Sequence, residues 1–507
     1  MVFAGFNWFL IIITAVLGLL SIGVALYLLI SYQHPEDKNQ AWFPKIAVIF
    51  GISLSIWTIL LFPIDVANTL ACSDSLAYTS CDLALPTTTL WYICYIAAAV
   101  MAFFVCPFAL YYYEADSDVS IVKRWINALI WVAVTAAILA LILGICYGLW
   151  GYVEYPVIGL ASGLAPFSAI SNSSEPLNKC IECDAINGDL PTYTWKIRLS
   201  FLVYVIAVVT TIGWLLFMVF CGAGLVALPL DMIREFLGRP KTCITKSEYM
   251  TRAKALGNKA KGIMESAAKL RKEDREVGRG RKWRQNYRLL NQEVLVLEEE
   301  EKQLELVYPQ STDPDYAWAV TVIIFYLKLL FGVVGVGLSI CWLLQILLYI
   351  FVYPPVTPFL NTLFTDLDNA FPLFGTVAFG IFCFYLIACV IKGATKVGLN
   401  LVVFTVHPMK VGATLMSSFL FNVALVLLAT QAAIQFCAQA FELYANNSAI
   451  QKIWGGQIDY VMGLKYLYRL HVFYYSLYAC VGLTAIYLIV RGPDRWKRYK
   501  VEDAYVV

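Results

Sequence analysis

A few charged side chains lie in otherwise apolar stretches of this sequence, and they are the first candidates for chemistry. The clearest case is LFPIDVAN, residues 61–68, which places Asp65 after a long apolar run. In an apolar setting a carboxylate can relay protons or bind a cation, and an amine can pair with a carboxylate. The same groups can instead only mark the ends of helices. The candidate set is Asp65, Glu114, Asp231 and Lys328.

Residue types that serve enzymes and metal sites are sparse. The three histidines, His34, His407 and His471, are not spaced as metal ligands. No P-loop, GxSxG or HExxH motif occurs, and GRGRK at 278–282 follows no strand and is not a phosphate loop. The sequence therefore predicts no enzyme, no cofactor and no metal site.

Composition and hydropathy indicate an all-α polytopic membrane protein. The chain has 507 residues, 60% hydrophobic and 14% charged, and apolar segments of about 20 residues match a bilayer. They divide the chain into 1–230 with spans one to five, a soluble segment 231–315, 316–490 with spans six to nine, and a basic tail 491–507. Nine transmembrane helices are predicted, at 8–29, 46–68, 90–112, 125–147, 200–225, 318–351, 371–391, 412–439 and 472–490.

Asp65 comes near the end of the second predicted span. Pro63 removes a backbone donor and disturbs a helix, and a carboxylate at a helix C-terminus is disfavoured by the helix dipole. The sequence therefore predicts that Asp65 either caps a short helix beginning at Val66 or pairs with Lys196 or Arg198, at the start of the fifth span.

The other three candidates lie in comparable positions. Glu114 follows CPFALYYY, and Asp231 lies in LPLDMI. Acids at span ends fit helix punctuation better than a proton path. Lys328 lies about ten residues, roughly 15 Å of helix, into the sixth span. It either extends its amine to the surface from a tilted helix or forms a buried ion pair with a carboxylate on another span.

The basic residues predict the orientation of the spans. Thirty Lys and Arg residues lie on the side of the segment 231–315 and the tail, six lie on the opposite side, and Lys328 lies within a span. Positive charge marks the cytosolic side, so the N-terminus is predicted outside and the C-terminus in the cytosol. The glycosylation sequons at Asn172 and Asn446 then fall on the outside.

Four of the 14 cysteines fall in the predicted outer loops. Cys72 and Cys81 are spaced to close a small disulfide loop on an oxidising side. Cys180 and Cys183 fit a strained disulfide, a redox pair or half a metal site, and the lack of a second CxxC favours a structural role. The other ten are predicted to be packed free thiols.

The segment 231–315 carries two heptad patterns, which predict an antiparallel coiled-coil hairpin in the cytosol. Glycines in REVGRGRKW mark the turn between the two helices. The acidic run 298–301 and the basic stretch 279–288 indicate either solvated faces or a docking surface for a partner or for anionic lipid. The predicted seam residues are Tyr249, Ala253, Leu256, Ala260, Ile263, Ala267, Leu270, Leu290, Val294, Leu297 and Leu304.

Five stretches of the chain carry a family resemblance. They are SYQHPEDKNQAWFPK (31–45), LFPIDVAN (61–68), CPFALYYYEAD (106–116), GLVALPLDMI (224–233) and HPMKVGATLMSSFLFNV (407–423). Together they resemble the limb-region membrane-protein (LMBR-like) family, and within it the receptor-like branch of the lipocalin-interacting membrane receptor. The resemblance spans nearly the whole chain, although Asp231 stands where this branch is expected to have a small residue. It implies a helical protein of the plasma membrane or endo-lysosomal membranes, without agreed catalytic or ligand-contacting residues.

Two classes of function fit these observations. A receptor or trafficking adaptor would contact a protein partner or a small apolar-ligand carrier through the outer loops 151–199 and 441–469, and would dock cytosolic partners on the hairpin. A transporter or channel would line a polar route with Asp65, Lys328 and Gln431. A lipid-handling role lies between the two classes, because a groove between helices needs no charges, and the resemblance adds cobalamin handling. Sparse charge within the spans and the lack of visible internal repeats favour the receptor or adaptor. Membrane lipid is an expected partner, and nucleic acid is not.

Overall fold

The structure is a computed structural model, and it describes most of the chain. The described residues are 8–34, 37, 42–73, 86–115, 120–158, 192–240, 244–276, 281–308, 314–352, 354–371, 373–397, 414–446, 448–454 and 458–491.

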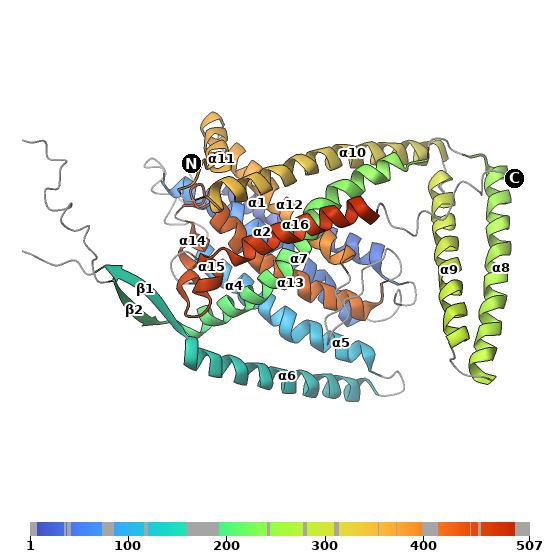
Figure 1. Ribbon diagram of the computed structural model, residues 1–507, viewed down its shortest axis with the longest axis horizontal. Helices are drawn as coiled ribbons and strands as arrows, with labels where there is room; N and C mark the ends of the chain where they lie inside the picture. The colour runs from blue at the N-terminus through green and yellow to red at the C-terminus, as the bar shows by residue number, and fades with distance from the viewer. Residues whose placement is uncertain are drawn as a thin grey trace, which may run out of the picture. The chain divides into compact units, whose positions relative to one another are not determined.

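Within these ranges, nine helices are long and apolar enough to cross a membrane, as the sequence predicts. The chain is an integral membrane protein built almost entirely from helices (Figure 1). The nine apolar segments are Ile11–Tyr32, Trp42–Leu70, Thr87–Glu114, Ile121–Trp150, Phe201–Leu237, Trp318–Ile350, Phe374–Lys396, Met416–Ala440 and Val472–Val490.

The elements follow one another along the chain as labelled in Figure 1. They are α1 (Trp8–Tyr32), α2 (Trp42–Ser73), α4 (Thr87–Val100), the π-helix η3 (Met101–Val105), α5 (Cys106–Glu114), α6 (Ile121–Trp150), β1 (Tyr152–Ile158), β2 (Thr192–Arg198), α7 (Phe201–Leu237), α8 (Lys246–Glu276), α9 (Arg281–Val307), α10 (Pro314–Gln345), the π-helix η6 (Ile346–Ile350), α11 (Phe359–Ala370), α12 (Phe374–Lys396), α13 (Met416–Ala440), α14 (Ala449–Trp454), the 3-10 helix η7 (Ile458–Tyr460), α15 (Lys465–Arg469) and α16 (Val472–Arg491).

Two helices continue past the predicted ends of their spans, residue 68 for α2 and residue 225 for α7. α2 runs through Pro63, and α7 runs through Pro229. The predicted helix start at Val66 is therefore wrong, as is the predicted end of the fifth span at residue 225. A proline removes one helical hydrogen bond, but a helix in an apolar bundle keeps its remaining bonds because no water competes for them.

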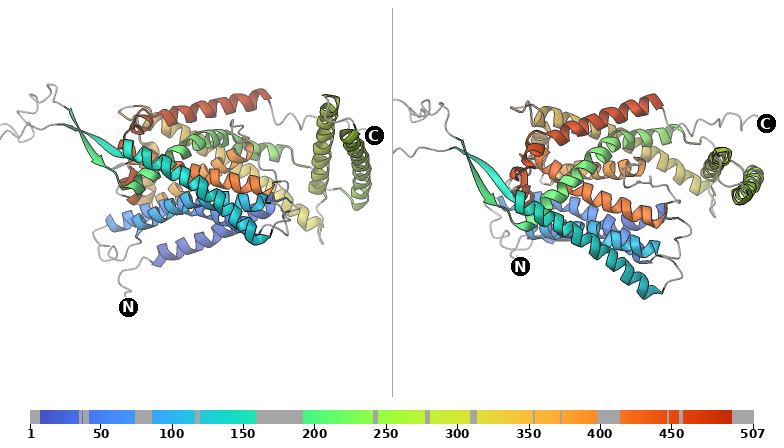
Figure 2. Two further views of the ribbon diagram at one scale, coloured as in Figure 1. Left: turned by 90° about the horizontal axis from the view of Figure 1, so that it is seen from below. Right: turned by 60° about the horizontal axis from the view of Figure 1, so that its bottom comes forward.

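The described chain forms two compact units. Unit 1 comprises Met1–Gly224 and Cys341–Cys480, and unit 2 comprises Leu225–Ile340 and Val481–Val507. In unit 1, α13 packs against α2, α5 and α12, and it has the largest buried share of the nine spans (Figure 2). The polar side chains of α13 therefore meet protein rather than lipid.

Two glycines allow α7 and α12 to cross at close range within unit 1. A Cβ on Gly224 would lie 1.9 Å from the carbonyl oxygen of Cys389, and a Cβ on Gly393 would lie 1.9 Å from that of Phe220. Any larger residue would push the backbones apart. Small residues at such crossings give membrane helices the close contact that replaces a hydrophobic driving force.

The predicted outer loop 151–199 begins and ends in strands, which the sequence analysis did not anticipate. β1 and β2 pair antiparallel, from Tyr152 opposite Arg198 to Ile158 opposite Thr192. The strands are β-branched and aromatic, YVEYPVI and TYTWKIR. The all-α expectation therefore holds for the spans but not for this two-stranded ribbon.

In unit 2, α8 and α9 run antiparallel and side by side (Figure 2). The rings of Tyr249 and Tyr308 stack at one end, and the Trp283 indole N–H donates to the carbonyl oxygen of Leu270 at the other. The cytosolic location of this hairpin and its coiled-coil packing remain predictions.

Candidate functional site

Asp65 is fully buried and holds the start of a distant helix. Its Oδ1 accepts the backbone N–H of Ala449 (3.2 Å), and its Oδ2 accepts the N–H of Ile450 (3.1 Å) and the indole N–H of Trp91 (2.9 Å). Ala449 and Ile450 open α14. Unpaired N–H groups at a helix start favour a negative charge, which offsets the cost of burying this carboxylate.

The cations expected for Asp65 have other partners. Lys196 lies 3.0 Å from Glu154. The Arg198 guanidinium lies over the rings of Tyr147 and Tyr152. The predicted capping role is therefore correct in kind, but the capped helix is α14 rather than one that begins at Val66.

Two further acids also accept a backbone N–H group at the start of a helix. Asp37 accepts the N–H of Met416 (3.1 Å) at the start of α13. Asp368, on α11, accepts the N–H of Gly375 (2.8 Å) at the start of α12. Asp37 thus joins two segments that are far apart in sequence, and Asp368 joins the consecutive helices α11 and α12. The sequence analysis singled out neither, because both lie in short polar stretches without an obvious helical partner.

Asp459 is held by side-chain amides rather than by a helix terminus. The amide nitrogens of Gln435 and Gln439 each donate to Asp459 Oδ1 at 3.3 Å, and Gln439 also donates to Oδ2 at 3.2 Å. The Trp214 indole donates to Gln435 Oε1 (2.6 Å), and the Tyr474 hydroxyl donates to Gln439 Oε1. An indole N–H can only donate, so it turns the Gln435 nitrogen toward Asp459.

The surroundings of Asp459 shift its protonation. Burial raises the pKa of Asp459 to about 6, and hydrogen bonds from Gln439 and Gln435 lower it in part. Gln431 lies on α13 one turn before Gln435 and is 1% exposed. Its amide nitrogen has no hydrogen-bond partner among the described residues.

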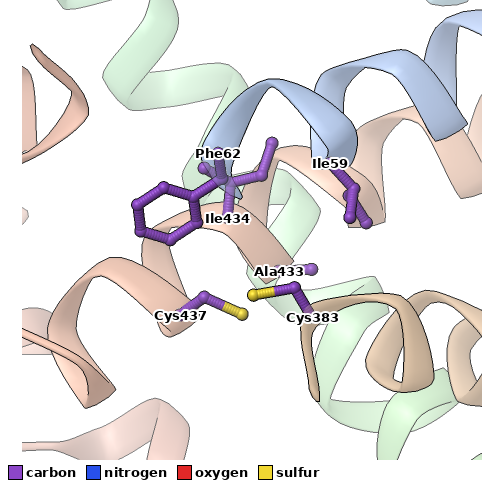
Figure 3. Close-up of a pocket in the computed structure, with 6 residues that line it drawn as sticks. All are labelled: Ile59, Phe62, Cys383, Ala433, Ile434 and Cys437. Atoms are coloured by element: carbon purple, nitrogen blue, oxygen red, sulfur yellow. The ribbon is translucent and has the colours of Figure 1, made fainter. Parts of the chain in front are cut away.

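Apolar side chains and two thiols line a narrow crevice between α2, α12 and α13. The sulfur atoms of Cys383 and Cys437 point toward each other across it (Figure 3). The space between the lining side chains is too narrow for a water molecule. Both cysteines are free thiols. The crevice offers no room for a solute in this conformation.

Lys328 forms an ion pair with Glu235 on α7, within unit 2. Lys328 Nζ lies 2.8 Å from Glu235 Oε2, and the two side chains are 39% and 45% exposed. The partner is a carboxylate on another span, as one alternative expected, but the pair is not buried in protein. Of the other predicted acids, Glu114 is exposed at the end of α5, and Asp231 lies half-buried inside α7 rather than at its end.

Several predicted sites lie outside the described residues, namely Cys81, Asn172, Cys180 and Cys183. Cys72 belongs to the last turn of α2, and Asn446 is exposed in a turn after α13. The proposed disulfides and glycosylation therefore stay predictions. Nine of the remaining ten cysteines are described, and none of these nine forms a disulfide.

The predicted hairpin seam coincides with the less exposed positions of α8 and α9. Leu270 and Leu304 are buried. Lys259, outside the seam, pairs with Glu300 at 2.8 Å across the two helices. The other nine seam residues are half-buried, namely Tyr249, Ala253, Leu256, Ala260, Ile263, Ala267, Leu290, Val294 and Leu297.

The two predicted outer contact loops meet in unit 1. Glu154 of β1 is 11% exposed and binds Lys196 of β2 and Lys465 of α15. Val153 also pairs with Val461 as an isolated antiparallel bridge. We call this assembly of β1, β2, η7 and α15 the outer element. Its exposed apolar side chains include Trp195, 62% exposed, Ile197 and Tyr466.

Comparison with known proteins gives the family. The family model described as LMBR1-like membrane protein matches residues 10–294 and 271–487. The chain belongs to the LMBR1-like membrane protein family. Among curated relatives, a LIMR family protein of Oryza sativa subsp. japonica is 44% identical over 98% of both chains. One of Arabidopsis thaliana is 44% identical over 99% of both. One of Dictyostelium discoideum is 32% identical over 98% of this chain and all of its own length.

The similarity to these LIMR family proteins covers nearly the full chain, which confirms the family resemblance. It therefore includes the segments that carry Asp65, Asp459 and the hairpin. No solved structure matches. Membership of this family shows that the chain is a multi-pass membrane protein. It assigns no role to any polar side chain, so each role is inferred from the contacts of that side chain.

Proposed function

We propose that this LMBR1-like protein is a non-enzymatic membrane receptor or trafficking adaptor of the plasma membrane or endo-lysosomal membranes. It binds a protein partner or a small apolar-ligand carrier on the outside and docks a cytosolic partner on the α8–α9 hairpin. The observation that carries this proposal is the outer element, in which two loops far apart in sequence are joined around Glu154.

The outer element has the features of a preformed contact surface. Its strands are fixed by the Glu154 ion pairs and by the N–H of Met462, which donates to the carbonyl oxygen of Tyr152 (2.8 Å). Trp195 and Tyr466 stay 62% and 61% exposed on it. Large aromatic side chains that remain exposed on a rigid element are typical of binding hot spots. The family name LIMR, printed for the relatives, agrees with a receptor but does not test it.

The acids that accept backbone N–H groups at helix starts favour this role over transport. Asp65, Asp37 and Asp368 all hold helix starts. A transporter would instead present such groups to a water-filled path. The transporter or lipid-handling alternative keeps Gln431, which is buried in α13, and gains Asp459, whose pKa burial raises to about 6.

A cross-linking experiment in intact cells tests the proposal. A photo-reactive amino acid replaces Trp195 in the full chain, and the matched control carries it at Leu141, an exposed residue of the spanning helix α6. We expect a discrete outer protein or carrier to cross-link at Trp195 and not at Leu141, and Glu154→Gln to weaken that product. Absence of a product at Trp195, together with solute flux in proteoliposomes that Asp459→Asn abolishes, would replace the receptor by a transporter.

A further inference from the structure

One side of α8 has a pattern that the hairpin seam does not explain. Its positions recur at steps of three and four residues, which places them on a single helix face. All of these positions are exposed. The series is Lys246, Met250, Lys254, Gly257, Lys261, Met264, Ala268 and Lys272, and we call it the methionine–lysine face.

The composition of this face is unusual for a solvated helix. It contains four lysines and no acidic residue, although α8 holds five acids elsewhere. Met250 and Met264 are 61% and 72% exposed between the lysines. Basic residues flanking exposed apolar ones are the composition of helices that lie in a membrane interface.

Charge is also segregated along the hairpin. Residues 269–288 hold nine basic and three acidic residues, whereas 289–308 hold one basic and six acidic. One of those acids, Glu300, forms an ion pair with Lys259, which lies outside the methionine–lysine face. The part of the hairpin near its turn therefore keeps a large net positive charge, which attracts anionic partners.

We propose that the methionine–lysine face of α8 lies on the anionic phospholipid surface of the membrane in which the same chain is embedded. This inference deepens the proposed function, because it rests on a cytosolic hairpin and names the lipid that positions it. α8 is 31 residues long, about 46 Å. The short connections 238–245 and 308–313 join the hairpin to the spanning helices α7 and α10, which keeps it within reach of that surface.

The chemistry of the face favours lipid over an acidic protein. Lysines near an anionic leaflet each add attraction that salt screens. Met250 and Met264 can insert flexible apolar side chains among the headgroups. The neighbouring seam faces α9, so a hairpin lying on this side keeps its interhelical contacts.

The test measures the approach of α8 to lipid in the full chain. An environment-sensitive fluorescent amino acid replaces Ala268, and the protein is placed in nanodiscs of phosphatidylcholine with or without phosphatidylserine, each containing brominated lipid as quencher. We expect quenching to be at least several-fold stronger with phosphatidylserine, and to fall when salt is raised from about 0.1 M to about 1 M.

Two charge-matched triple variants test the face itself. Lys254→Glu, Lys261→Glu and Lys272→Glu together should abolish the quenching. Arg252→Glu, Lys259→Glu and Lys269→Glu carry the same change of charge on other sides of α8 and should retain most of it. Equal loss in both variants, or no effect of phosphatidylserine, would overturn the proposal.

Protease protection in sealed proteoliposomes separates this proposal from the proposed function. Quenching with the hairpin on the outer side would contradict the cytosolic orientation but support lipid binding by the methionine–lysine face. A cytosolic hairpin that ignores lipid charge but binds an acidic peptide through Lys254 and Lys261 would overturn the lipid face and keep the adaptor.

Discussion

Asp65 accepts three buried hydrogen bonds, so its substitution should markedly lower the free energy of unfolding. Asp65→Ala leaves the N–H groups of Ala449 and Ile450 and the Trp91 indole without an acceptor in a buried site. Each buried donor left unpaired costs about 1–3 kcal/mol. We expect thermal unfolding in detergent to show a loss of several kcal/mol for Asp65→Ala and a smaller loss for Asp65→Asn, which keeps one acceptor oxygen.

Thr69→Ala, one turn along α2, is the matched control. It removes only the Thr69 hydroxyl bond to the carbonyl oxygen of Asp65 (2.8 Å). A loss for Asp65→Ala no larger than that of the control would mean that the capping bonds carry little stability. Solute flux lost in Asp65→Asn without a change in stability would give Asp65 a transport role.

The pH dependence of stability should report on Asp459. Its pKa is raised from 3.8 to about 6 by burial, so folding favours the protonated form. The stabilisation that protonated Asp459 gives the folded state is fully present below pH 3.8 and is lost as the pH rises through about 6. It amounts to about 3 kcal/mol at most. The melting temperature should therefore be higher at about pH 5 than at about pH 7.5, apart from opposing shifts at other groups.

Asp459→Asn isolates the contribution of the Asp459 charge to stability, because it removes the charge and keeps the volume of the side chain. The variant should melt higher than the unsubstituted protein at about pH 7.5, and the difference should shrink at about pH 5. Asp366→Asn, on the exposed side of α11, serves as control. An equal pH profile in the Asp459→Asn variant and the unsubstituted protein would contradict the assignment.

At the scale of elements, Glu154 decides whether the outer element stays together. Its bonds to Lys465 and Lys196 hold the pKa of Glu154 below its usual value. The stabilising contribution is therefore present above its ordinary pKa of 4.5 and is lost as the pH falls through the lowered value. Glu154→Gln should increase hydrogen exchange in β1, β2 and α15 but not in α13, measured by mass spectrometry. Lys196→Gln breaks only one of the two pairs and should have a smaller effect.

The α8–α9 hairpin depends on its seam. Leu256→Asp with Ile263→Asp places two charges between the helices and should separate them, with faster hydrogen exchange in 246–276 and loss of cytosolic partner binding. Membrane insertion should not change. Ala255→Asp with Ser266→Asp adds the same charge at exposed positions outside the methionine–lysine face. Partner binding that survives separation of the helices would remove the hairpin from the docking role.

Local patterns explain which elements the sequence predicts. The nine spans and the seam of α8 and α9 follow from hydrophobic runs and heptads, which depend on residues close in sequence. Pro63 led to the wrong prediction of a helix start at Val66, and Pro229 to the placing of Asp231 at a span end, because the cost of a proline depends on the surroundings of the helix. β1 and β2 were missed since their pairing crosses the 33 residues between Ile158 and Thr192, and no turn signal joins them.

At the scale of the whole molecule, the polar groups are explained by partners that sequence spacing cannot identify. Asp65 was predicted to cap a helix, but its partners lie 384 and 385 residues away. The Asp459 cluster gathers side chains from α7, α13 and α16. Gln431 alone was singled out from the sequence, although Gln431, Gln435 and Gln439 recur at i, i+4 spacing on an apolar helix.

The orientation of all nine spans can be tested with the two sequons. If the N-terminus is outside, Asn172 and Asn446 face the glycosylating compartment, and a sequon inserted at 278–280 does not. Asn172→Gln should remove one glycan, seen as a mobility shift that a glycosidase reproduces. Asn446 should carry a glycan on only part of the protein, because Ser448 is fully buried and its hydroxyl accepts the N–H of Gln451 (3.4 Å) in folded α14. Modification of the inserted sequon and not of Asn172 would reverse the orientation and place thirty basic residues outside.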